Sequence, residues 1–309
     1  KKNKPNTKET SDRIKTKKYL IEIGNQTKAD TLKYNTDNYI TLYRLGSIYD
    51  YFYNKMPPST GKLKDFDLTY IKDNGFTLRF PTVYINDKIK KYEHHPHMFE
   101  VFAEYKEWAK LIGVKNSVDL NKVVSTGKIS DLIKIDETLQ SNRLLNVAKA
   151  INTRKNKVKV VLMAGPSSSG KTTTSRKLCM YLKSFGLEPQ TIGMDDYFVE
   201  KEETPKDVKL FDKVISDLLE GKKVKLPTYN FVLGKKEYHN EMQLGDKDIL
   251  IIEGIHALDP KILSNISREK KFKIYISPLT ELSIDDHNRI PTTDNRLLRR
   301  IVRDNRTRN

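Results

Sequence analysis

The chain has 309 residues, enough for two domains, and its 37% of hydrophobic residues is ordinary for a folded protein. No apolar segment approaches the length of a membrane span, and a single cysteine, Cys179, excludes an internal disulfide, so we expect a cytoplasmic protein with no membrane partner. The net charge of +17 leaves RNA binding open, but the lysines are scattered without aromatic-interleaved basic repeats, which favours solvated lysine-rich surfaces.

The first third of the chain has mixed strand and turn patterns, which predict a small α+β domain over residues 1–92. Residues 39–43 alternate as a strand does, and residues 76–80 form a second strand that Pro81 ends. From residue 97 the apolar residues recur at helical spacing until Gly113, and a second helical stretch covers residues 139–151. We therefore expect a helical connector over residues 93–155.

The remainder, residues 156–309, alternates apolar strands with helices. We expect strands at 158–164, 190–194, 248–254 and 272–276, and helices at 172–185, 210–219 and 296–306. This alternation predicts an α/β fold with a parallel sheet and helices on both faces. In such folds ligands bind at the carboxyl ends of the strands.

The first of these strands runs into the sequence G-x-x-x-x-G-K-T, from Gly165 to Thr172, and then into a helix. This order is typical of a P-loop, in which backbone N–H groups and a helix N-terminus surround phosphate groups. Lys171 is expected to reach the outer phosphates, and the Thr172 hydroxyl to bind Mg²⁺. The predicted nucleotide-binding residues are Gly165, Ser167, Ser168, Ser169, Gly170, Lys171, Thr172 and Thr173.

Acidic residues follow two of the other strands. Asp195 and Asp196 could orient an acceptor hydroxyl and take its proton, although Asp is equally common in caps and turns. Glu253 ends a wholly apolar strand, which indicates a Mg²⁺ ligand of the Walker B type. His256 lies close enough in sequence to touch substrate, although such a histidine is more often structural.

The predicted last helix is rich in arginine, in a chain that otherwise prefers lysine. Arg296, Arg299, Arg300 and Arg303 share one helix face, and the planar guanidinium suits phosphate oxygens. We expect a lid over the phosphates, and the alternative is a solvated or RNA-facing helix.

Five ordered motifs resemble the bacterial uridine kinase and phosphoribulokinase-like branch of P-loop kinases over about residues 156–309. They are GPSSSGKTT, MDDYF, PTYNF, IIEGIHAL and DDHNRIPTTDNRLLRRIVRD. The resemblance implies Mg²⁺-dependent transfer of the ATP γ-phosphoryl group to the 5′-hydroxyl of a nucleoside. It implies catalytic roles for Asp195 as base and for Lys171, Arg300 and Arg303, with Arg308 also binding phosphate. The implied substrate contacts are Asp196, Tyr197, Tyr229 and His256.

The chain departs from that family pattern in two ways. Gly234 stands where uridine kinases have a base-contacting histidine, which weakens the expectation of pyrimidine recognition but not of phosphoryl transfer. Members of the family also have more residues near 207/208 and 308/309 and a further strand and helix at the C-terminal end. We therefore expect segments of the kinase domain to be missing at these places.

Residues 27–32, 40–46 and 50–61 resemble the second additional, editing-type domain of threonyl-tRNA synthetase. Where that family has D-L-C-R-G-P-H-V-P-S-T-G, this chain has D-Y-F-Y-N-K-M-P-P-S-T-G. Phe52 replaces the cysteine and Met56 the histidine, so hydrolytic editing is not expected. The histidines at 94, 95 and 97 flank a proline and are expected to form a loop without metal.

Three functions remain open on the sequence. The favoured one is an ATP-dependent kinase of a small-molecule nucleoside. The second is a tRNA- or RNA-associated regulatory protein that uses ATP binding as a switch. The third is a kinase of another small alcohol such as a sugar phosphate. Homo-oligomerisation is left open.

Overall fold

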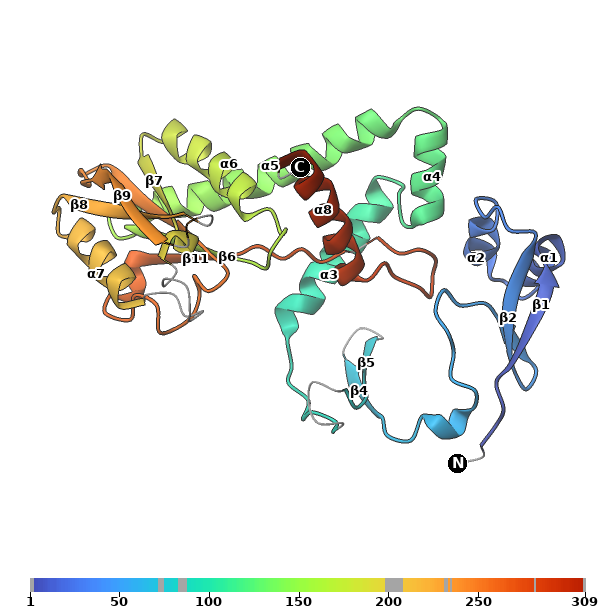
Figure 1. The fold of residues 1–309 in the computed structure, drawn as a ribbon. Helices are drawn as coiled ribbons and strands as arrows, with labels where there is room; N and C mark the ends of the chain where they lie inside the picture. The colour runs from blue at the N-terminus through green and yellow to red at the C-terminus, as the bar shows by residue number, and fades with distance from the viewer. Residues whose placement is uncertain are drawn as a thin grey trace. The chain divides into compact units, whose positions relative to one another are not determined.

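The computed structural model describes residues 3–71, 75–82, 88–197, 208–230, 233, 235–280 and 282–307. The chain divides into two compact units. The front unit comprises Lys1–Thr126 with Glu281–Ile290, and the P-loop unit comprises Gly127–Thr280 with Pro291–Asn309. In chain order the helices and strands are β1 (Thr7–Asp12), α1 (Arg13–Glu22), α2 (Gln26–Thr31), β2 (Tyr39–Leu45), β3 (Ile48–Asp50), the 3₁₀ helix η1 (Thr60–Lys62), β4 (Asp67–Ile71), β5 (Gly75–Arg79), α3 (Pro96–Leu111), α4 (Ser117–Ser125), α5 (Ile129–Thr153), β6 (Val160–Ala164), α6 (Lys171–Ser184), β7 (Glu188–Gly193), the 3₁₀ helix η3 (Met194–Tyr197), α7 (Val208–Leu219), β8 (Val224–Asn230), β9 (Lys235–Met242), β10 (Asp248–Glu253), the 3₁₀ helix η4 (Arg268–Lys270), β11 (Lys271–Tyr275) and α8 (Thr292–Thr307) (Figure 1).

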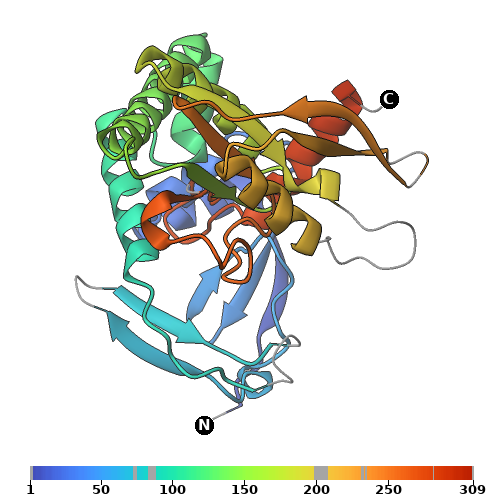
Figure 2. The same cartoon turned by 90° about the vertical axis from the view of Figure 1, so that its left-hand side faces the viewer.

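The P-loop unit is built on a four-stranded parallel sheet with the order β11-β6-β10-β7. Its central strands β6 and β10 are almost wholly buried, because helices cover both faces. Buried residues of α7 pack on one face and those of α5 and α6 on the other (Figure 2). This confirms the α/β fold predicted from the alternating strands and helices.

The strand register brings the ends of three strands to one edge of the sheet. Glu253, the last residue of β10, pairs with Met163 of β6 and with Gly193 of β7. The segments that follow these strands therefore begin side by side, which is the edge where ligands bind in parallel sheets.

The predicted elements of this unit form within a few residues of their expected ends, α8 beginning four residues early. The hairpin of β8 and β9 was not predicted, and its strands pair antiparallel with an irregularity between Leu226 and Thr228. Charged and amide residues dominate β9, and most of its residues are exposed, so its sequence carries no apolar alternation that would indicate a strand.

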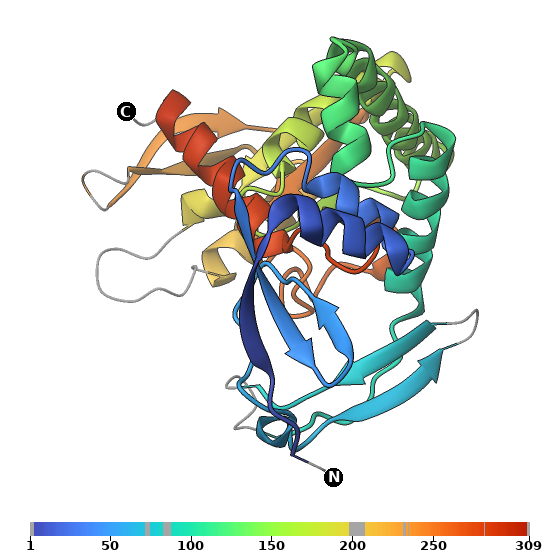
Figure 3. The same ribbon diagram turned by 90° about the vertical axis from the view of Figure 1, so that its right-hand side faces the viewer.

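The front unit contains a three-stranded antiparallel sheet, β1-β2-β3, with α1 and α2 beside it (Figure 3). Its core is small and is formed by buried residues of the helices and of β2, among them Leu20, Ala29 and Leu42. The Asp12 carboxylate caps α1 by accepting hydrogen bonds from the backbone N–H groups of Ile14 and Lys15. A separate hairpin of β4 and β5 follows.

The units divide the chain differently from the predicted domains 1–92, 93–155 and 156–309. Helices α3 and α4 belong to the front unit and α5 belongs to the P-loop unit. Helix α5 joins the P-loop unit because its last turns bury Leu144, Ala148 and Ile151 in the core beside α6. Among the described helices, none combines the length and the apolar character that a membrane span requires.

Candidate active site

The loop between β6 and α6 has the geometry of a phosphate cradle. Gly170 and Ser168 have positive φ angles, of 94° and 60°, and such turns point successive N–H groups to one side. A Cβ on Gly165 would lie 2.7 Å from both the Ile276 carbonyl oxygen and Ser169 Oγ, so only glycine fits there. Helix α6 then begins at Lys171 and directs its N-terminus at the same space.

Two side chains of the motif, Lys171 and Thr172, make hydrogen bonds beside the loop. Lys171 Nζ donates to the carbonyl oxygens of Gly165 and Pro166, at 2.9 and 3.2 Å, and so lies along the loop. Thr172 Oγ1 donates to Glu253 Oε1 at 3.1 Å. Glu253 Oε2 is buried and has no hydrogen-bond partner among the described residues. A buried carboxylate oxygen without a hydrogen bond needs a positive partner, and Mg²⁺ prefers carboxylate and hydroxyl oxygens as ligands. Glu253 and Thr172 together therefore suit Mg²⁺.

The two aspartates after β7 have different environments. Asp195 is exposed and faces the cleft described below. Asp196 is half-buried, and its Oδ1 accepts a hydrogen bond from the Tyr229 backbone N–H at 3.3 Å, which ties η3 to β8. Burial raises the pKa of Asp196; the Tyr229 hydrogen bond opposes that rise and the Asp195 charge adds to it. The two carboxylates thus differ in position: Asp195 is exposed at the cleft, and Asp196 is half-buried and bonded to the backbone of β8.

Helix α8 packs its arginines against the P-loop. Arg296 Nε donates to the Ser167 carbonyl oxygen at 3.3 Å, and Arg299 Nε to that of Ser168 at 3.2 Å. Both arginines belong to the helix face that was predicted to form a lid over the phosphates, although neither was named as an individual catalytic or nucleotide-binding residue. Only the tertiary structure shows that they contact the loop backbone.

The predicted catalytic arginines lie one turn further along the same face. Arg303 donates through Nε and Nη2 to Asp304 Oδ1, at 2.9 and 2.8 Å, and Arg300 Nε lies 3.5 Å from Asp304 Oδ2. The three side chains are partly exposed, and ion pairs of this kind contribute at most about 1 kcal/mol. Both arginines also line the cleft described below.

These elements enclose a cleft of about 970 Å³. Its lining includes the predicted residues Ser167, Ser168, Ser169, Gly170, Lys171, Thr172, Thr173, Asp195, Asp196, Glu253, Arg300 and Arg303. Gly193, Gly254, Ile255, Leu298 and Val302 also line the cleft and were not predicted, and Arg299, a member of the predicted arginine lid, completes it. Four segments far apart in sequence thus meet at the edge of the sheet where the parallel strands end.

Three predicted substrate contacts lie elsewhere. Tyr197 is only 1% exposed, and its ring packs edge-on against Phe211 with centroids 4.9 Å apart, so in this structure it is a core residue. Burial raises the pKa of its hydroxyl. Among the described residues, the cleft lining does not include Tyr229, which is half-buried, or His256, which is exposed. Arg308 and Gly234 lie outside the described residues, as do residues 201–207.

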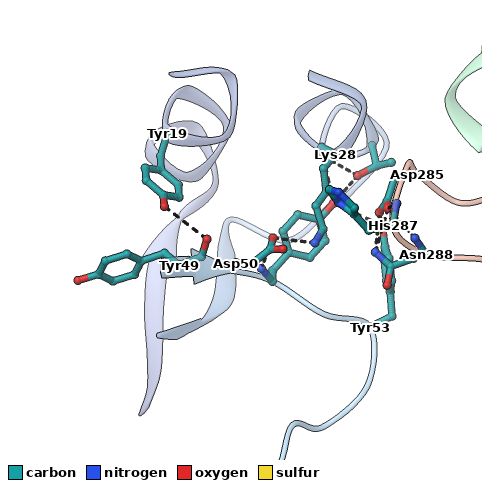
Figure 4. A network of polar contacts seen from close by, with 10 residues as sticks. Tyr19, Lys28, Tyr49, Asp50, Tyr53, Asp285, His287 and Asn288 are labelled. Atoms are coloured by element: carbon teal, nitrogen blue, oxygen red, sulfur yellow. Dashed lines mark hydrogen bonds and ion pairs between the residues drawn. The ribbon is translucent and has the colours of Figure 1, made fainter. Parts of the chain in front are cut away.

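In the front unit, aromatic residues of the segment 50–61, which was predicted to resemble an editing motif, contact a buried lysine. Phe52 and Tyr51 each place their ring 4.9 Å from Lys28 Nζ. Lys28 is 1% exposed and pairs with Asp50 at 2.6 Å (Figure 4). The histidine stretch is exposed, and no group of three metal-ligating side chains is found within the part of the chain that the structure describes.

Comparison with known proteins bears on the P-loop unit. Residues 197–309 match the model of the phosphoribulokinase/uridine kinase family. Among curated proteins, inorganic pyrophosphatase TTM2 of Arabidopsis thaliana is 27% identical over 43% of this chain and 21% of its own length. Uridine-cytidine kinase C of Dictyostelium discoideum is 35% identical over 33% of this chain and 24% of its own. The uridine kinase of Staphylococcus aureus strain JH9 is 28% identical over 48% of this chain and 70% of its own length.

The solved structure of a possible uridine kinase from Bacillus stearothermophilus is 24% identical, with a TM-score of 0.36, and covers 43% of this chain and 79% of its own. The chain spans about a quarter or less of the first two curated relatives. The matches support a P-loop kinase family for the C-terminal part of the chain. The resemblance of the front unit to threonyl-tRNA synthetase stays a prediction.

Proposed function

We propose that this chain is an ATP- and Mg²⁺-dependent kinase that phosphorylates the 5′-hydroxyl of a nucleoside. The observation that carries the proposal is the shared cleft: the P-loop, Asp195 and the arginines of α8 all line one space of about 970 Å³. Its size suits a nucleotide and a small acceptor together. The similarity to uridine kinases supports the choice of acceptor.

The donor half of the reaction uses the P-loop and the arginine helix. The loop N–H groups and the start of α6 bind the phosphates of ATP, and Lys171 reaches from its place along the loop to the outer ones. Thr172 and Glu253 would hold Mg²⁺, which neutralises phosphate charge when bound. Arg300 and Arg303 stabilise the charge that develops on the transferred group.

The acceptor half depends on Asp195. Its carboxylate orients the acceptor hydroxyl and takes its proton while the new oxygen–phosphorus bond forms and the bond to the β-phosphate oxygen breaks. Asp196 supports this geometry indirectly, because its contact with the Tyr229 backbone fixes η3 against β8. Positioning of the two reactants supplies most of the expected acceleration.

The experiment is an acceptor panel with ADP release and product mass as readouts. Purified protein is incubated with Mg²⁺ and ATP together with uridine, cytidine, purine nucleosides, sugar phosphates or tRNA. We expect a phosphorylated nucleoside, and we expect Asp195→Asn to lower kcat by about 10²–10⁴-fold with little change in KM for ATP. Asp246→Asn makes the same chemical change at an exposed turn of the same unit and serves as the control.

Each alternative has its own signature in that panel. A product formed only with a sugar phosphate would keep the kinase chemistry but replace the acceptor. ATP hydrolysis that no small acceptor changes, combined with salt-sensitive tRNA binding, would overturn the proposal in favour of an RNA-associated switch.

A further inference from the structure

Residues 282–290, which we call the docking loop, leave the P-loop unit and belong to the front unit. The loop follows Thr280 and returns at Pro291, directly before α8. It folds on itself: the Ile284 N–H donates to the Asn288 carbonyl oxygen at 2.7 Å, and Ser283 and Arg289 form an isolated antiparallel bridge. A segment of the P-loop unit's own sequence is thus packed within the other unit.

Asp285 is the centre of the docking loop and is only 1% exposed. Its Oδ1 accepts hydrogen bonds from the N–H groups of His287 and Asn288, and Tyr53 OH of the front unit donates to its Oδ2 at 3.3 Å (Figure 4). Burial raises the pKa of Tyr53, and the charge of Asp285 adds to the rise, so the hydroxyl keeps the proton that it donates.

Three further parts of the front unit bind the same loop. Thr27 of α2 donates through its hydroxyl to Asp286 Oδ2 at 2.6 Å. Ser117, at the start of α4, donates its N–H to the Ser283 carbonyl oxygen at 2.9 Å and its hydroxyl to that of Ile284 at 2.8 Å. The Arg289 guanidinium lies 4.3 Å from the centroid of Phe102 in α3.

The base of the loop is closed within the P-loop unit. The Thr280 N–H donates to Thr292 Oγ1 at 3.2 Å, and Asn295 Nδ2 donates to Thr280 Oγ1 at 2.9 Å. Helix α8 begins at Thr292, two residues after the docking loop ends, and carries Arg296 and Arg299 onto the P-loop carbonyl oxygens. The docking loop and the arginine helix are therefore joined through Pro291 alone, next to the hydrogen bonds that close the base of the loop.

We propose that the front unit holds α8 in its phosphate-binding position by gripping the docking loop, and that Tyr53, Thr27 and Ser117 are positioning residues for the arginine lid. None of the three lines the cleft at the P-loop. They act through the loop, because each binds it by a side-chain hydroxyl and the loop continues directly into the helix. The consequence for catalysis rests on the proposed kinase function, but the consequences for α8 and for ATP binding do not require an acceptor.

The test removes the three hydroxyl groups without altering any residue of the P-loop unit. The variant combines Tyr53→Phe, Thr27→Ala and Ser117→Ala. The control makes the same chemical changes at exposed sites of the front unit, namely Tyr70→Phe, Thr7→Ala and Ser125→Ala. Hydrogen exchange is measured separately for residues 282–290, for α8 and for β1 with β2, and the Kd of Mg·ATP is measured by titration.

We expect exchange in the docking loop and in α8 to rise about tenfold or more in the variant, with β1 and β2 unchanged. The Kd of Mg·ATP should rise about five- to tenfold, and the control should match the unaltered protein. Faster loop exchange with α8 and the Kd unchanged would overturn the proposal. Unchanged loop exchange would overturn it as well, because the three hydroxyls would then not hold the loop.

Two further results are informative. If the triple variant does not fold, judged by its circular dichroism, Tyr53→Phe alone is subjected to the same measurements, and the same outcomes decide. If the unaltered protein binds Mg·ATP but phosphorylates no acceptor, the proposed function fails, while the exchange and binding data still decide the role of the docking loop.

Discussion

Gly254 lies between strand β10, whose Glu253 is proposed to hold Mg²⁺, and the segment of the proposed catalytic base, and replacing it with alanine should disturb both. It follows Glu253 at the end of β10, and its N–H donates to the Met163 carbonyl oxygen at 3.1 Å. A Cβ at this position would lie 2.7 Å from Met194 Cβ and 2.9 Å from its sulfur. Met194 is 1% exposed and immediately precedes Asp195. The new methyl group of Gly254→Ala therefore displaces Met194, the residue directly before the proposed base Asp195.

The size of the effect follows from the contact distances. Ordinary contacts of a Cβ begin at 3.4 Å, so Met194 Cβ must retreat by roughly 0.7 Å, and a Cβ cannot move without its backbone. Overpacking of this kind costs about 1–3 kcal/mol of folding free energy, which lowers Tm by roughly 2–4 °C per kcal/mol. Misplacement of a catalytic group by ~1 Å can cost ~10²-fold in rate, so we expect kcat to fall about 10- to 100-fold.

The assay measures kcat with the acceptor identified in the panel, together with Tm. The matched control is Gly245→Ala in the same unit, where the nearest atom to the new Cβ, Asp248 Oδ2, is 3.5 Å away and the backbone conformation is open to alanine. If Gly254→Ala and Gly245→Ala have the same kcat and the same Tm, the steric argument is refuted.

Three other perturbations test separate parts of the structure. Glu253→Gln should abolish the additional rise in Tm that Mg²⁺ produces with ATP, because a neutral amide binds a hard cation weakly; an unchanged Mg²⁺ effect would exclude Glu253 as a ligand. Burial raises the folded-state pKa of Asp196 above 3.8, so the free energy of unfolding should fall as pH rises from about 4 through that pKa. Asp196→Asn should lose this fall in a series of Tm values from pH 4 to 8, and a pH dependence equal to that of the unaltered protein would contradict the assignment. Asp50→Asn leaves buried Lys28 without its counter-charge and should lower the free energy of unfolding by about 3–5 kcal/mol. Urea denaturation followed by the fluorescence of the single tryptophan, Trp108, measures this loss, and Asp37→Asn at an exposed site should leave the free energy of unfolding almost unchanged.

The local pattern of the sequence was enough to predict the parallel sheet of the P-loop unit and the helices that cover it. The apolar strand before Gly165, the glycine-containing loop and the helix after it are each indicated by residues only a few positions apart, so this segment could be predicted without knowledge of the tertiary structure. The acid at the end of a buried strand could be placed beside the loop for the same reason, since parallel strands end at one edge. Helix α8 was predicted because its apolar and arginine residues recur at helical spacing.

Long-range packing decided what local pattern could not. Tyr197 follows two aspartates that line the cleft, yet its ring is buried against Phe211, because a 3₁₀ turn directs neighbouring side chains to different sides. The contacts of Arg296 and Arg299 with the P-loop carbonyl oxygens join residues about 130 positions apart in the sequence. Hydrophobic periodicity relates only near neighbours, so it could not predict these contacts.

The docking loop shows most clearly how long-range packing decides what the local sequence does not. Its sequence reads as a polar turn before α8, and it was assigned with the rest of residues 156–309. Its hydrogen-bond partners Thr27, Tyr53 and Ser117 come from three separate parts of the front unit. Composition and periodicity determine which residues form strands and helices, because those forces act between near neighbours. Which unit receives a loop is decided only when surfaces distant in sequence complement one another in hydrogen bonds and charge.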